Sequence, residues 1–382
     1  MVKKEQKKRF IYIDLLRGFA VLVMVEVHVF NTFLLSEFRE AEWFKVLNFI
    51  NGLVAPAFLF ISGYAFVLVA QRKWNDYLTF SPVFWKQIGR ILQVWLVGYA
   101  LHLPFFSFKK LLRIESAELD VFWKVDVLHC IAFSLAFLLL LVVIFRERKK
   151  FFAAVVFSSL VIIFLSPLVY DKNFDEYLAV PIANYFSAYH HSLFPLFPWM
   201  AFVLSGGVVS QLVVWQKEKT VEEKIFFRIV TAGIFFVLLT VVTKYFGIEL
   251  YPPHDYWRSS PGFFFMRLGI VITLLGGLWF WEQKRNSQKS FVSIVGSESL
   301  VAYAGHLLVI YGMFFNDHSL SFIIGKTRTV PEVLGMTIIL VAATIAVSYL
   351  WNRIKGWSMT YAQVLQYSIL IVVVYIFFTK PY

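Results

Sequence analysis

The sequence predicts an all-α fold, a polytopic integral membrane protein built as a bundle of about eleven transmembrane helices. Of its 382 residues, 59% are of hydrophobic types and only 16% are charged, against roughly 25% in a typical soluble domain. The mean hydropathy is +0.69. A soluble protein would have to hide this surface in one core, and single cores stop growing at about 250–300 residues. Lipid covers apolar side chains directly, so the composition favours a membrane protein.

Apolar runs of about 20 residues, the length that spans a bilayer, recur along the whole chain. The segments between them are too short to fold alone, so we expect one transmembrane domain over residues 1–382 with a short basic tail at 1–9. The first run is too long for a cleavable signal peptide and is therefore the first span. The predicted spans are 10–35, 46–70, 83–106, 121–145, 151–170, 193–215, 225–246, 263–281, 299–315, 333–351 and 362–378.

The distribution of basic residues predicts the orientation. Lys and Arg favour cytoplasmic loops, and with the N-terminus inside, every inside loop is basic and the inside segments hold most of the 36 Lys and Arg. We therefore expect a cytoplasmic N-terminus and an external C-terminus in the cell (inner) membrane. If the marginal segment 362–378 does not cross, the span count becomes even. The net charge of +12 is spread over these loops, so we expect the lipid bilayer and not nucleic acid as partner.

The composition also restricts metal and disulfide chemistry. Cys130 is the only cysteine, which excludes an intrachain disulfide and a cysteine-based metal cluster. The sequence contains no HExxH motif, and no metal is expected. Homo-oligomerisation is left open.

The first span carries charges within the predicted hydrocarbon region, a costly arrangement that usually marks function. Arg17 and His28 are eleven residues apart, so they lie within about 20° of one helix face and about 16 Å apart along the axis. Asp14 can pair with Arg17 as an i, i+3 neighbour. Arg17 could bind the phosphates of a cytoplasmic donor, and His28 could act as a general base. The alternative is an interfacial ion pair and a hydrogen-bonded packing histidine.

The stretch IDLLRGFAVLVMVEVH, with Arg17 and His28, resembles the first-helix motif of the transmembrane acyltransferases. That superfamily includes the acyltransferase-three enzymes and heparan-alpha-glucosaminide N-acetyltransferase, and of these two the closer resemblance is to bacterial relatives of the latter. Supporting stretches are NGLVAPAFLFISGYAF at 51–66, DVLHCIAFSL at 126–135, FPLFPWMAFVLSGGVVSQ at 194–211 and SLVAYAGHLLVIYG at 299–312.

The resemblance implies transfer of an acyl group, acetyl above all, from cytoplasmic acetyl-CoA (an acyl-CoA) to an acceptor across the membrane. The acceptor would be a glycan or another small molecule with a hydroxyl or amine. The resemblance assigns the donor to Arg17 and catalysis to His28. One departure is expected, since no segment of the sequence resembles the luminal soluble domain of the lysosomal enzyme.

Other polar residues fall into an outer and an inner set. In the outer set, Asp126 and His129 could form an acid–base pair on the fourth span, and Asn51, His190 and His191 could line an acceptor pocket. In the inner set, Lys86, Arg90 and His306 could contact the donor. Ordinary interfacial or packing roles are the alternative for each of them. Arg267 is expected to snorkel to the outer interface.

A second function remains open from the residues alone. A permease or flippase could use Asp14, Arg17, Glu26 and His28 to bind or relay a charged solute. Matched pairs of broken helices would favour such a carrier, and the sequence shows none. The sequence does not decide which acceptor is used or how long the acyl chain is. It also does not decide whether transfer is direct or passes through an acyl-His28 intermediate.

Overall fold

The computed structural model describes residues 10–103, 106–113, 121–216, 219–284, 290–313 and 318–380, without the side chains of residues 219 and 220. Over these ranges the chain is helical, and its only pairing of extended segments is an isolated bridge between Leu34 and Arg328. The predicted all-α fold is confirmed. The basic tail at 1–9 and the loop residues Lys217, Arg285 and Lys289, used in predicting the orientation, lie outside the described residues.

Eight helical segments of the described chain are long and apolar enough to cross a membrane, or nine if a bent pair counts as one span. The bent pair is α15 (Phe291–Ser297) with α16 (Ser299–Tyr311), which meet at 87°. The two other predicted spans form α1 (Ile11–Phe33) and α5 (Pro82–Leu101), which carry charged residues and are not among the nine. At 1.5 Å per residue, both are still about as long as the hydrocarbon layer is thick, roughly 30 Å.

The centre of the bundle is a close crossing of α3 (Val54–Arg72) and α11 (Leu196–Val214). A Cβ on Gly63 would lie 1.8 Å from the carbonyl oxygen of Val203, and one on Gly206 would lie 1.9 Å from that of Phe60. Both positions therefore require glycine, because each backbone occupies the space of the other's side chain. Small residues that allow such close approach are typical of helix packing in membranes.

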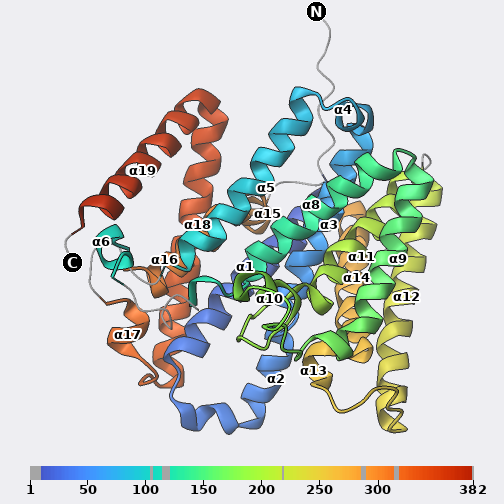
Figure 1. Cartoon of the computed structure of the whole chain (residues 1–382), viewed down its shortest axis with the longest axis horizontal. Helices are drawn as coiled ribbons and strands as arrows, with labels where there is room; N and C mark the ends of the chain where they lie inside the picture. Colours follow the sequence, from blue (N-terminus) through green and yellow to red (C-terminus); the bar gives the residue numbers. More distant parts are fainter. Residues whose placement is uncertain are drawn as a thin grey trace, which may run out of the picture.

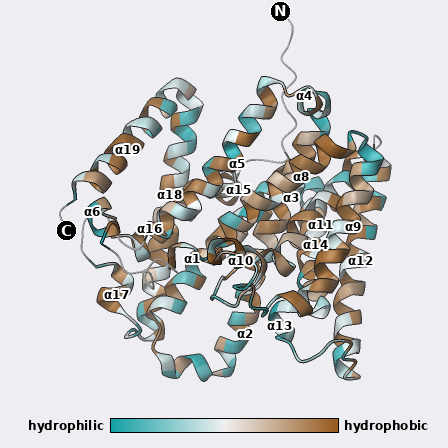
Figure 2. Cartoon of the chain, in the orientation of Figure 1, coloured by the Kyte–Doolittle hydropathy of each residue, from teal (hydrophilic) through white to brown (hydrophobic). Residues whose placement is uncertain are grey.

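A second close crossing covers the first half of α1. There α15 packs against α1, and Cβ atoms on Gly18 and Gly296 would each meet the opposite backbone within about 2 Å. The remaining long helices are α8 (Val127–Phe145), α9 (Arg148–Val169), α12 (Lys219–Tyr245), α14 (Pro261–Lys284), α18 (Val330–Trp357) and α19 (Met359–Thr379). Figure 1 shows α9 and α12 at one edge of the bundle and the α18–α19 hairpin at the other. Figure 2 shows hydrophobic residues along α9 and α12, as expected for lipid contact.

The predicted inside ends gather at one end of the bundle, near the start of α1. Arg72 stacks over the Phe10 ring at 5.6 Å, and Trp74 donates to the carbonyl of Arg146 at 3.0 Å. Glu282, near the end of α14, accepts from the backbone N–H of Tyr12 at 2.7 Å. We call this end the N-terminal end.

The opposite end, which we call the loop end, carries most of the short helices. Figure 1 shows α2, α13 and α17 there, on the far side of the bundle from the N-terminus. The short helices of the chain are η1 (Ser36–Glu40), α2 (Glu42–Asn51), α4 (Trp74–Leu78), α6 (Phe108–Leu111), α10 (Val180–Phe186), α13 (Tyr256–Ser259) and α17 (Leu320–Ile324).

Candidate active site

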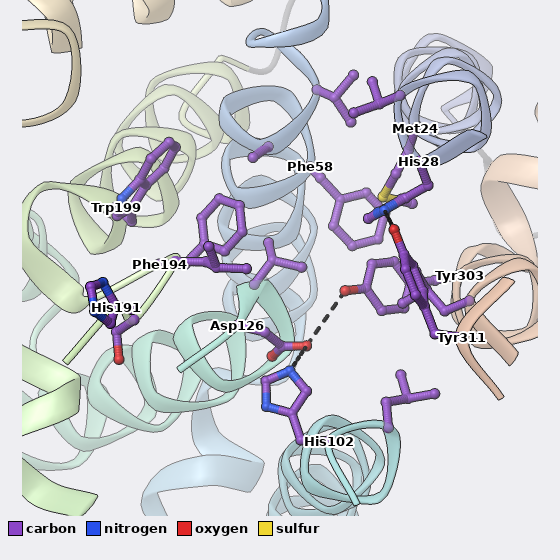
Figure 3. Close-up of a pocket in the computed structure, with 18 of the residues that line it drawn as sticks. Met24, His28, Phe58, His102, Asp126, His191, Phe194, Trp199, Tyr303 and Tyr311 are labelled. Carbon is purple, nitrogen blue, oxygen red and sulfur yellow. Dashed lines mark hydrogen bonds and ion pairs between the residues drawn. The ribbon is translucent and has the colours of Figure 1, made fainter. Parts of the chain in front are cut away.

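A cavity of about 1030 Å³ lies at the loop end, near the upper limit of roughly 300–1,000 Å³ for small-molecule sites. Its walls come from α1, α2, α3, α5, α8, α11, α13, α14 and α16 and from the loop that precedes α11. His191, Trp257 and Arg258 line it and are exposed, so the cavity opens at the loop end. Figure 3 shows the side chains that face it.

His28, the predicted catalytic base, lines this cavity near the end of α1. Its Nδ1 lies 3.4 Å from the Tyr311 hydroxyl (Figure 3). That hydroxyl is 2.7 Å from the Thr32 hydroxyl. Tyr311 ends α16, so two helices fix the position of the imidazole. A His28 tautomer that donates through Nδ1 leaves Nε2 free to accept a proton.

His306 lies behind His28 and does not line the cavity. Its ring centroid is 5.3 Å from that of His28, and its Nδ1 donates to the carbonyl oxygen of Ala302 at 2.8 Å. Its side chain is buried, and Nε2 has no hydrogen-bond partner among the described residues. The sequence grouped His306 with the donor residues, but the structure brings it next to His28.

Asp126 is the carboxylate of the cavity. It is the N-cap of α8, and its Oδ1 accepts from the backbone N–H groups of Leu128 and His129 at 2.9 and 3.0 Å. Its Oδ2 faces the cavity, 3.7 Å from Nε2 of His102 and 3.5 Å from the Tyr303 hydroxyl (Figure 3). The cap therefore fixes one oxygen and presents the other to a ligand.

The surroundings keep this carboxylate charged. Burial alone would raise the pKa of Asp126, but the hydrogen bonds and charge of His129, together with His102, leave that pKa below its ordinary value. Burial lowers the pKa of His102, and the neighbouring Asp126 carboxylate opposes that shift only in part. Near neutral pH the site thus holds a carboxylate beside a neutral imidazole.

His129 contacts Asp126 as the sequence predicted but does not reach the cavity. Its Nδ1 lies 2.8 Å from Oδ1 of Asp126 and 3.2 Å from the backbone nitrogen of Asp126, and the contact with that backbone group completes a capping box. The side chain is fully buried, its ring lies 4.1 Å from that of Tyr99, and a Cβ on Gly98 would fall 2.9 Å from its Nε2. His129 therefore positions Asp126, while the imidazole that faces the cavity beside it is His102.

The three predicted acceptor residues separate in the structure. Asn51, at the end of α2, lines the cavity and donates to Glu26 at 3.3 Å. His191 lines the mouth with a positive φ of 64°. His190 is not a lining residue, because its Nε2 faces the Asp175 carboxylate at 2.6 Å.

The predicted donor residues lie towards the N-terminal end. Arg17 is absent from the lining, which along α1 includes Met24, Val27 and His28. Asp14 is buried near the crossing with α15, whereas Lys86 and Arg90 are exposed at the start of α5. The structure does not join these residues and His28 in one cavity, and their role stays a prediction.

Sequence reasoning did not assign Tyr303, Tyr311 and Arg267 to the site, and it placed His102 only in the general set of outer polar residues. Tyr303 and Tyr311 lie with His306 in the stretch 299–312, and their spacing on one helix was the available indication. The expectation that Arg267 snorkels is wrong, since its side chain is 7% exposed and lines the cavity. Among the residues described, no group of three or more His, Cys, Asp or Glu is placed to hold a metal ion.

These features define a class of protein. A helical membrane bundle that presents an oriented imidazole and a capped carboxylate to one cavity is suited to acid–base chemistry on a bound substrate. The family model for heparan-alpha-glucosaminide N-acetyltransferase, catalytic, matches residues 9–245, more than half of the chain. The chain belongs to this family, and by its family it is a membrane acyltransferase. Among curated proteins, no sequence matches the chain.

Proposed function

We propose that the protein transfers an acetyl group from cytoplasmic acetyl-CoA to a hydroxyl or amine of a glycan outside the cell membrane, with His28 as general base. One observation carries the proposal: His28, on the first span, faces the cavity and is oriented by the Tyr311 hydroxyl at 3.4 Å. Family membership supports acyl transfer as the reaction. The domain is the whole described bundle, and the N-terminal end is cytoplasmic.

The chemical step needs one base and one leaving group. Neutral His28 takes the proton as the acceptor oxygen or nitrogen attacks the thioester carbon. The new C–O or C–N bond forms, the C–S bond breaks, and the proton passes to the sulfur to give free CoA thiol. Such a base typically contributes about 10²–10⁴-fold in rate.

The donor would enter from the N-terminal end. There Arg17, with Asp14 as its predicted pairing partner, and the exposed Lys86 and Arg90 would bring positive side chains to the CoA phosphates. Arg17 precedes Met24, the lining residue of α1 nearest to it in sequence, by seven residues, or about 10 Å of helix. The thin pantetheine arm would bridge this interval, so the thioester reaches His28 while the nucleotide stays outside the cavity.

The acceptor would enter from the loop end. Asn51 lines the cavity and His191 its opening, and Asp126 with His102 offers a second acid–base pair. We favour direct transfer, in which both substrates are bound together at His28. An acetyl-His28 intermediate would instead release CoA before the acceptor binds.

The test is acetyl transfer by purified protein in nanodiscs, followed by release of CoA thiol and mass spectrometry of candidate glycan acceptors. His28→Ala should lower kcat by at least about 100-fold and leave CoA affinity unchanged. The control is His318→Ala, an exposed histidine that stacks on Phe322 away from the cavity. Normal turnover by the His28 variant would refute the assignment, and CoA release without an acceptor would favour the acetyl-histidine route.

A further inference from the structure

A buried arginine in the cavity has no carboxylate partner. Arg267 is on α14 and is 7% exposed, and its Nη1 donates to the carbonyl oxygen of Phe49. The guanidinium carbon lies 4.4 Å from the Phe49 ring centroid and 5.8 Å from that of Phe263. Within the described ranges, no carboxylate oxygen comes within 4 Å of it, and Nε has no hydrogen-bond partner.

An unpaired cation at such a site is costly, because burial removes the water that would stabilise it. One carbonyl and two aromatic rings offset only part of that cost. Elsewhere in the fold a buried charged group does have partners: the carboxylate of Glu298 accepts hydrogen bonds from both Lys355 and Asn352. The charge on Arg267 is therefore available to an anion that enters the cavity.

The fold also leaves room for the guanidinium. A Cβ on Gly52, just past the end of α2, would lie 2.7 Å from Nη2 of Arg267. Any larger residue there would displace the Arg267 head group from the cavity wall. The absence of a side chain at Gly52 and the contact with Phe49 together fix the guanidinium, so its planar fork is held in place before a ligand arrives.

Arg267 and His28 lie at the same depth in the bundle. Near the N-terminal end, Tyr12 of α1 bonds Glu282 of α14, so these two residues share one level. His28 follows Tyr12 by sixteen residues, or about 24 Å, and Arg267 precedes Glu282 by fifteen, or about 22 Å. Since α1 and α14 run antiparallel and are in contact, both side chains reach the cavity at nearly the same height.

We propose that Arg267 binds an anionic group, a carboxylate or a sulfate, on the acceptor, and so selects acidic acceptors. The inference rests on the proposed acyl transfer. Arg matches the two oxygens of such a group by paired hydrogen bonds. The phosphates of CoA share this chemistry, but they would lie with Arg17 at the opposite end of the bundle. An acceptor anion bound to Arg267 brings the rest of the acceptor beside His28.

The test measures binding without turnover, with glucuronate as the probe and glucose as its neutral match, at constant ionic strength. Glucuronate should bind the full-length protein in nanodiscs, and glucose should bind at least tenfold more weakly. Arg267→Gln should weaken glucuronate binding at least tenfold, and Arg267→Lys by a smaller factor because it keeps the charge without the fork. Lys45→Gln removes an exposed charge from α2 and should bind as the parent does.

A second arm distinguishes the two sources of the anion. CoA affinity should be the same in Arg267→Gln and the parent, and a tenfold loss would assign Arg267 to a donor phosphate and overturn the proposal. Equal glucuronate binding by parent and variant would overturn it as well. If Arg267→Gln does not fold, the comparison of Arg267→Lys with Lys45→Gln decides. Arg267-dependent glucuronate binding in a protein that transfers no acetyl group would refute the enzyme function and leave the anion site standing.

Discussion

The Tyr303 hydroxyl lies 3.5 Å from Oδ2 of Asp126. Through neighbouring rings, this contact relates the Asp126 carboxylate to His28. Tyr303 is on α16, and its ring meets that of His306 edge-on at 5.8 Å. His306 in turn neighbours His28 at 5.3 Å. A chain of contacts therefore runs from the capped carboxylate on α8 to the histidine on α1, through one face of α16.

Tyr303→Phe should lower kcat because the Asp126 oxygen loses a donor on the side that faces His28. We expect a decrease of about three- to tenfold, the effect of one ordinary hydrogen bond. The measurement is steady-state acetyl transfer at saturating acetyl-CoA. Tyr367→Phe, on the exposed face of α19, is the control and should change nothing. A full rate in Tyr303→Phe would show that the contact only supports packing.

Asp126→Asn should destabilise the protein at neutral pH but not in acid. The pKa of Asp126 lies below its ordinary value of about 3.9, so the charged group stabilises the fold above that pH and the contribution is lost as the pH falls through the folded-state pKa. Asn still caps α8, since its side-chain oxygen can accept the same N–H bonds. The melting temperature of the variant should therefore lie below that of the parent at pH 7, and the two should converge below about pH 4. A difference that stays constant with pH would assign the effect to geometry and not to charge.

Gly206→Ala should separate α3 from α11, because the new methyl would lie 1.9 Å from the Phe60 carbonyl oxygen. Overpacking of this kind costs about 1–3 kcal/mol, which should appear as a lower melting temperature in nanodiscs. Gly277→Ala is the matched control, since a Cβ there meets nothing within 4 Å. Equal melting temperatures for the two variants would contradict the close crossing seen in the structure.

Much of the fold can be predicted from hydropathy, because every segment that crosses the lipid must be long and largely apolar. Ten of the eleven predicted spans contain a long helix. The ninth, predicted at 299–315, contains only the 13-residue α16, and α15 precedes it across Glu298 at an angle of 87°. Periodicity could not predict this break, since both parts are apolar. The break matters for the site, because it sets α15 against Gly18 and lets α16 bring Tyr303, His306 and Tyr311 to the cavity.

The predicted pairs within the candidate site came from single stretches of chain, while Asn51 and His191 were predicted only as members of the outer polar set. His28 was found from its spacing to Arg17, and Asp126 from its spacing to His129. The partner that faces the cavity beside Asp126 is His102, which comes from another helix end and could not be chosen from several outer histidines. Arg267 was misjudged because a basic residue near a helix end usually reaches water, and only the contacts with Phe49 and Gly52 show that it does not.

The last prediction concerns Arg17 and the donor. If Arg17 binds CoA phosphates, the planar fork matters as well as the charge, so Arg17→Lys should weaken CoA affinity about tenfold and leave kcat at saturating acetyl-CoA nearly unchanged. Arg353→Lys is the control, because Arg353 lies on the last part of α18, which the sequence places inside, and stacks on Trp357 at 5.5 Å.

The structure makes this test demanding, since Arg17 is outside the cavity lining and about 16 Å along α1 from His28. A tenfold loss of CoA affinity restricted to the Arg17 variant would require the donor to extend beyond Met24 along α1. Unchanged affinity would instead confine Arg17 to a structural role at the crossing of α1 and α15, and the donor would then have to reach His28 by another path.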